Sequence, residues 1–151
     1  ITIPQFARPV ADITNANHWL DNAASSVTIF DVIDESVLST ADFIQSSAGL
    51  STAVYVCRIT TTIEDPVSSA NHVVRYTYRK NSSGQAQINL TVELRQDYVS
   101  EAGLGTLIWT TNHVNIASSV QSTAAVTLLA AEADAITAYS SLYLRFISNQ
   151  V

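Results

Sequence analysis

Residues 73–96, "VVRYTYRKNSSGQAQINLTVELRQ", contain two runs in which apolar and polar side chains alternate. In the first run Val74, Tyr76 and Tyr78 are separated by Arg and Thr, and in the second run every other residue is Ile, Leu or Val. A period of two residues is typical of a half-buried β-strand. The polar residues 81–84 between the runs favour a turn. The stretch therefore predicts an antiparallel hairpin with one apolar and one polar face.

Further strands are predicted on both sides of this hairpin, whose own strands cover residues 72–80 and 85–97. "TAVYVCRITTTIE" at 52–64 and "TLIWTTNHVNI" at 106–116 are rich in β-branched and aromatic residues, which favour strands. We expect these strands to form an antiparallel meander sheet of about five strands. The residues before them, 1–50, are expected to be irregular or to form an N-terminal hairpin or extension.

The pattern changes after residue 116, where the alternation is lost. Val126, Leu129, Ala133 and Ile136 follow helical spacing. We therefore expect a C-terminal helix, or two, over residues 120–148, and a single α+β domain. A short helix covers little of a five-stranded sheet, so the apolar face of the sheet needs further cover. A partner copy of the chain could supply it.

Composition limits the classes of protein to consider. The 151 residues suit one domain, with 47% hydrophobic and only 13% charged residues. The formal net charge of −6 argues against nucleic-acid binding by the whole surface, but it leaves room for one basic face. The single cysteine, Cys57, excludes an intrachain disulfide and is expected to be a buried, inert thiol. No apolar run approaches 18 residues, so no membrane-spanning segment is expected.

In-register pairing would give the sheet two unlike faces. The apolar face would collect Tyr55, Cys57, Ile59, Val74, Tyr76, Tyr78, Ile88, Leu90, Val92 and Leu94. The other face would hold four of the seven Lys and Arg residues, and of the acids only Glu93 clearly joins them. A solvated sheet face explains this pattern, and so does a surface for RNA, where Arg contacts phosphate and Thr or Asn contacts bases and 2′-hydroxyls. The residues predicted to contact RNA are Arg58, Arg75, Thr77, Arg79, Asn89, Thr91, Arg95 and His113.

The same stretch resembles the coat proteins of the single-stranded RNA bacteriophages. In that family a strand ends in Arg, a Ser-Ser turn follows, and the returning strand ends in Val-Glu-Val. Here Arg79 is followed by Ser82-Ser83 and by "VEL" at 92–94. Trp109 and the tail at 120–151 stand in the order of the family's tryptophan-bearing strand and helical tail. The resemblance covers about half of the chain.

The resemblance implies a structural capsid protein located in the virion. The family's subunits form interlocked homodimers whose continuous sheet lines the inside of a shell, while their helices cross onto the partner's sheet. Its RNA-contacting positions match Arg75, Thr77, Arg79, Asn89 and Thr91. The expected partners are therefore further copies of the chain and single-stranded RNA.

No pattern for catalysis is present. The three histidines lie far apart, without the spacing of a metal site, and no nucleophile motif or Gly-rich phosphate loop occurs. We therefore expect no enzymatic activity, no cofactor and no metal. Two alternatives stay open: an extracellular filament or pilus subunit assembled by strand donation, and a monomeric carbohydrate- or ligand-binding β module.

Overall fold

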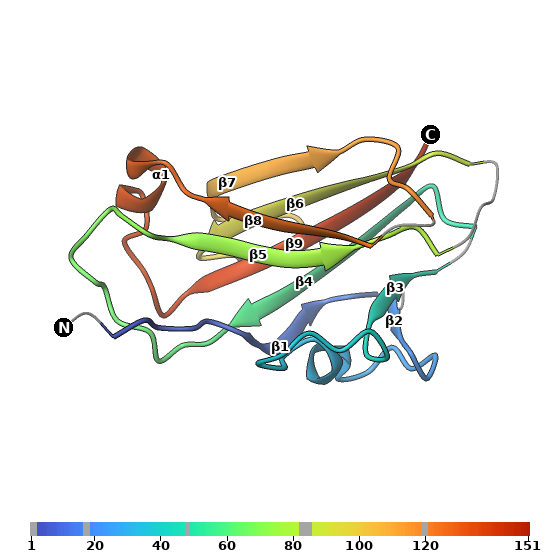
Figure 1. Ribbon diagram of the computed structural model, residues 1–151, viewed down its shortest axis with the longest axis horizontal. Coiled ribbons are helices and arrows are strands. Elements are labelled where there is room, and N and C mark those ends of the chain that lie inside the picture. The colour runs from blue at the N-terminus through green and yellow to red at the C-terminus, as the bar shows by residue number, and fades with distance from the viewer. Residues whose placement is uncertain (1–2, 17–18, 48, 82–85, 119–120) are drawn as a thin grey trace.

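The computed structural model describes residues 3–16, 19–47, 49–81, 86–118 and 121–151 (Figure 1). It is mostly antiparallel sheet with one short α-helix, which confirms the predicted sheet-rich α+β class. The elements are β1 (Pro9–Thr14), β2 (Trp19–Asp21), the 3₁₀-helix η1 (Ile29–Val32), β3 (Ile44–Ser46), β4 (Thr52–Ile59), β5 (Val73–Tyr78), β6 (Ile88–Gln96), β7 (Thr106–His113), β8 (Ser122–Thr127), α1 (Ala130–Asp134) and β9 (Leu142–Gln150).

The strands form a two-layered sandwich. A five-stranded sheet has the order β1-β4-β9-β6-β7, and the two-stranded sheet β5-β8 lies across its inner face (Figure 1). Strands β2 and β3 form a separate pair near the N-terminal part of the chain. Three antiparallel pairs are nested along the chain: β4 with β9, β5 with β8, and β6 with β7. This nesting is the connectivity of a jelly roll, here with six strands in place of the usual eight.

The predicted hairpin between residues 73 and 96 is wrong in its pairing. Both strands exist, but β5 pairs with β8, whereas β6 pairs with β7 and β9. The meander is therefore wrong as well. The predicted turn at 81–84 falls mainly on residues outside the described part of the chain. Alternation identifies a strand and its inward side, but it does not identify the neighbouring strand, which depends on contacts distant in sequence.

The predicted helical tail at 120–148 is also wrong. Within the described residues from 121 onward only α1 is α-helical, while β8 and β9 are strands. β9 lies in the centre of the large sheet, between β4 and β6. Leu142, Leu144 and Phe146 pack in the core, while the residues between them face the other side. Main-chain hydrogen bonds to β4 and β6 stabilise β9 as a strand. Such contacts with neighbouring strands decide the structure of this segment, and a local helical pattern does not reveal them.

The predicted inward side chains are confirmed in both sheets, apart from Ile88. Tyr55, Cys57 and Val92 are fully buried, and Ile59, Val74, Tyr76, Tyr78, Leu90 and Leu94 lie in or against one core between the layers. Ile88 is half-buried at the start of β6. Burial raises the pKa of the Cys57 thiol to about 12, which agrees with an inert thiol. The hydroxyl of Tyr55 donates a 2.6 Å hydrogen bond to Asp12, whose carboxylate also accepts the main-chain N–H groups of Ile29 and Phe30. The carboxylate thereby attaches η1 to strands β1 and β4.

Two leucines of the tail distinguish this sandwich from a helical tail. Leu142 is buried, whereas Leu129, which the helical pattern places on the apolar face, is 69% exposed. We expect Leu142→Ala to lower the free energy of unfolding by about 3 kcal/mol. Leu129→Ala should change it by less than about 0.5 kcal/mol. Urea denaturation of both variants measures the difference, and equal effects would contradict the observed packing.

Candidate functional site

The eight residues predicted to contact RNA do not share one face. Arg58, Asn89, Thr91 and Arg95 lie on the outer face of the large sheet. Arg75 and Thr77 lie on the outer face of β5, on the opposite side of the sandwich, and Arg79 follows directly after that strand. His113 lies between the two layers. The prediction of a single basic face is therefore wrong, because it assumed one sheet. These residues belong to strands of two different sheets, whose outer faces point in opposite directions.

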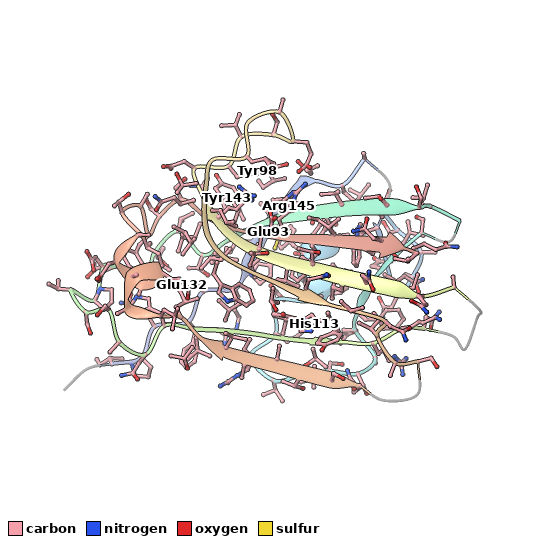
Figure 2. The ribbon with its side chains drawn as sticks, turned by 90° about the horizontal axis from the view of Figure 1, so that it is seen from above. Glu93, Tyr98, His113, Glu132, Tyr143 and Arg145 are labelled. Atoms are coloured by element: carbon pink, nitrogen blue, oxygen red, sulfur yellow. The ribbon has the colours of Figure 1, made fainter. Side chains whose placement is uncertain are left out.

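The arginines of the large sheet are engaged in a compact ion-pair network. Arg95 and Arg145 both donate to Glu93, at 2.6 and 3.0 Å, and their side chains are 10–12% exposed. Arg145 also binds Glu101 at 2.5 Å. Figure 2 shows Glu93 and Arg145 together with Tyr98, on the side of the sheet away from His113. These arginines neutralise carboxylates of their own chain and are not presented to a polyanion.

The loop at 97–105 covers this network. Tyr98 is buried against Tyr143, and its hydroxyl donates to Glu101 at 2.7 Å. The loop closes at Gly105, whose φ of 66° favours glycine and whose missing Cβ leaves room for the carbonyl oxygen of Gln96. This end of the outer face is therefore occupied by the chain itself.

Arg58 is also engaged on this face. Its Nη2 donates to the carbonyl of Ser140 at 2.9 Å, and its guanidinium lies 5.8 Å from the centre of the Tyr143 ring. Asn89 accepts a hydrogen bond from the main chain of Asn115, and Thr91 donates to Asn112. The polar side chains of this face thus form hydrogen bonds with neighbouring strands and loops of the same chain.

His113 is part of an aromatic cluster between the layers. Its ring stacks on Tyr78 with centroids 4.1 Å apart, and its Nε2 and Nδ1 lie 2.6 and 2.8 Å from the hydroxyls of Tyr76 and Tyr78. Burial lowers the pKa of His113, which favours the neutral ring. With both nitrogens hydrogen-bonded to tyrosines, His113 connects β7 to β5.

Two arginines on and directly after strand β5 have no ion-pair partner among the described residues. Arg75 and Arg79 are exposed, and among the described residues neither forms a salt bridge. Between them, the side chain of Thr77 has one hydrogen-bond partner among the described residues, the hydroxyl of Thr123 on β8, at 3.2 Å. These residues form the basic strip, defined as Arg75, Thr77 and Arg79.

A long groove runs beside β5, on the side away from β8. Its volume is about 1710 Å³, which exceeds the 300–1,000 Å³ typical of small-molecule pockets. Core side chains such as Leu144 and Phe146 form part of its lining, and residues 35–40 and 42–46 line it as well. Exposed apolar side chains extend this lining, since Val37 and Leu38 are 76% and 63% exposed. The groove is therefore an uncovered part of the core.

The main chain of β5 is unpaired along this groove. The N–H of Leu128 donates to the carbonyl of His72, which makes these two residues a hydrogen-bonded pair in the register of β5 and β8. Bonded and non-bonded pairs alternate in antiparallel sheets. The N–H and C=O groups of Val73, Arg75 and Thr77 therefore point away from β8 and form an open strand edge. Among the described residues, they have no partner strand.

Other types of site have less support. A second cavity of about 450 Å³ is lined by Asp65, Asp134 and Tyr139, and the hydroxyl of Tyr139 is 2.8 Å from His72 Nε2. In the described part of the chain, no group of three or more His, Cys, Asp or Glu residues is placed to hold a metal ion. The described residues include no helix with the length and apolar character needed to cross a membrane.

Comparisons with protein-family models, with curated proteins and with solved structures find no match to this chain. The candidate site is therefore defined by geometry alone: an apolar groove, an open strand edge and the basic strip. Alternation predicted the strand and its outward arginines. The open edge was missed because it depends on which strand pairs with β5.

Acidification should weaken the ion-pair network. Burial would raise the pKa of Glu93, but hydrogen bonds from Arg95 and Arg145 outweigh it and lower the pKa; a hydrogen bond from Arg145 likewise lowers that of Glu101. A lowered pKa in the folded state stabilises the fold above the ordinary value near 4.5, and this stabilisation is lost as the pH falls through the folded-state pKa.

We expect Glu93→Gln to lower the free energy of unfolding at pH 7 by about 3 kcal/mol, because two buried arginines lose their shared charge. The difference from the unmodified protein should shrink below pH 4.5. Glu64→Gln, at an exposed position, is the matched control and should have little effect. Urea denaturation between pH 3 and 7 measures both; a pH-independent difference would contradict the role of the Glu93 charge.

Proposed function

We propose that this chain is a structural subunit that assembles with copies of itself, with the groove beside β5 as the contact. The observation that carries the proposal is the uncovered core along an open strand edge. Exposed apolar patches of this kind mark interaction sites in soluble proteins, and an unpaired edge is a template for another chain.

The distribution of charge supports contacts between copies. The chain has 13 acidic and 7 basic residues, and Arg95 and Arg145 are occupied by internal carboxylates. The surface of one copy is therefore mainly acidic, and the basic strip of another copy offers the opposite charge. Complementary charges of this kind orient partners and favour one register over another.

The assembly that we propose is a capsid shell in a virion. The hairpin and helical tail that suggested a resemblance to phage coat proteins are not formed in this fold, so the proposal rests on the groove and on the jelly-roll connectivity, which is common in viral capsid domains. An open filament is the alternative, because a contact between two different surfaces closes into a ring or shell only if its rotation permits. The proposal involves no chemical step. The interlocking of two copies through C-terminal helices is not part of it, since the tail forms β8 and β9.

Assembly can be tested directly on the purified chain. We expect negative-stain electron microscopy and sedimentation velocity to show particles or filaments that grow with protein concentration, because each copy carries both partner surfaces. Added salt should weaken the contact. A monomer that persists at high concentration and low salt would contradict the proposal.

RNA packaging is a second candidate, favoured by the two uncommitted arginines of the basic strip. We expect the double variant Arg75→Ala/Arg79→Ala to retain less co-purified RNA, because phosphate contacts supply much of nucleic-acid affinity. Arg58→Ala is the matched control and should retain RNA, because Arg58 binds the carbonyl of Ser140. The absorbance ratio at 260 and 280 nm measures this. Equal RNA content in all samples would remove RNA from the proposed function.

A further inference from the structure

We propose that the assembly contact is strand addition: an extended segment of a neighbouring copy pairs with β5 and lies in the groove. The inference rests on the proposed self-assembly and specifies its chemistry. The segment would have apolar side chains toward the core and acidic or polar side chains toward the basic strip. It would act as the third strand of the small sheet.

The open edge supplies the main-chain part of this contact. Val73, Arg75 and Thr77 direct their N–H and C=O groups into the groove, in the spacing of an antiparallel or parallel ladder. A peptide main chain matches this row of donors and acceptors, residue by residue. A sugar or a small apolar ligand does not carry hydrogen-bond donors and acceptors at the regular spacing of a strand. The edge therefore favours an extended chain over the other ligands that an apolar groove admits.

The side chains of β5 define which segment fits. Val74 and Tyr76 point toward the core, and Tyr76 also lines the groove together with Phe146 of the large sheet. Neighbouring strands place side chains of the same face next to each other. Every second side chain of the added strand would thus lie over this apolar surface, and an apolar residue there would be removed from water.

The outward side chains of the added strand would lie beside Arg75 and Arg79. Opposite charges at facing positions stabilise a strand pair, and like charges destabilise it. This disfavours the simplest dimer, in which β5 pairs with β5 of a second copy, because that arrangement brings the two basic strips together. The acidic surface of a second copy is the complementary partner. The contact is then head-to-tail, which generates rings, shells or filaments.

A proline at position 77 tests strand addition without disrupting the pairing of β5 with β8. The N–H of Thr77 points into the groove, so its removal leaves the ladder to β8 intact, and proline is tolerated where an edge N–H faces outward. We expect Thr77→Pro to weaken association by about tenfold or more, since it removes one hydrogen bond and obstructs the edge.

Thr77→Val is the matched control. Both variants lose the hydroxyl contact to Thr123, but valine keeps the main-chain N–H. We expect Thr77→Val to associate like the unmodified chain, as measured by sedimentation velocity at several concentrations. Circular dichroism and thermal melts verify that both variants fold.

A peptide probe tests the chemistry of the segment independently of variants. The probe is a fluorescein-labelled hexapeptide of alternating Val and Glu; its controls are the Val/Lys peptide and a Val/Glu peptide N-methylated at alternate residues. We expect the unmodified chain to bind the Val/Glu peptide more tightly than either control by fluorescence anisotropy. This preference should be lost with Arg75→Glu/Arg79→Glu.

The outcomes separate the two proposals. A chain that never associates but binds the Val/Glu peptide selectively overturns the proposed function and supports the strand-binding edge. Association that survives Thr77→Pro, or equal binding of the N-methylated peptide, overturns strand addition and leaves self-assembly standing. Association that is abolished by ribonuclease also overturns strand addition, because nucleic acid would then connect the copies.

Discussion

The unequal width of the two layers determines the rest of this structure. Strands in a sheet are about 4.8 Å apart, so five strands span roughly 20 Å while two span roughly 5 Å between their outer axes. The pair β5–β8 cannot cover the inner face of the sheet formed by β1, β4, β9, β6 and β7. Segments near the N-terminus, including η1 and the pair β2–β3, pack against the remainder. The groove is the part that neither covers.

The same constraint explains why the two surfaces of the sandwich differ. In the large sheet, β9 is the central strand, and the loop at 97–105 covers the charged residues at one end of the outer face. Arg95 and Arg145 face carboxylates from their own sheet and loop, and Arg58 donates to the carbonyl of Ser140. The small sheet has no such cover. Arg75 and Arg79 extend from a strand with one open side, which is why the exposed positive charge and the unpaired main chain occur together.

The sequence predicted the direction of side chains far better than the partners of strands. Alternation placed Val74, Tyr76, Leu90 and Val92 correctly in the core, because the two faces of a strand are determined locally. It could not show that β9 enters between β4 and β6, since that pairing brings together residues 46 to 97 positions apart.

The prediction of a single basic face was wrong for the same reason, because the partners of the strands were not known. Arg75 and Arg95 both point outward, as predicted, but from different layers. An outward residue is assigned to a particular surface only when the sheet to which its strand belongs is known. The helical spacing of the tail was misleading for a related reason: small and apolar residues can satisfy either period, and the available neighbours decided in favour of strands.

Several features of the β5 edge favour a role in binding another strand. Proteins protect open edges by short strands, prolines, bulges or charges that point inward. β5 has six residues, no proline and a regular register with β8, and its inward residues are Val74, Tyr76 and Tyr78. Its one protection is the outward charge of Arg75, which opposes pairing with an identical edge but favours an acidic one. An edge that repels its own kind and accepts the opposite charge distinguishes between partners, as a directional assembly contact requires.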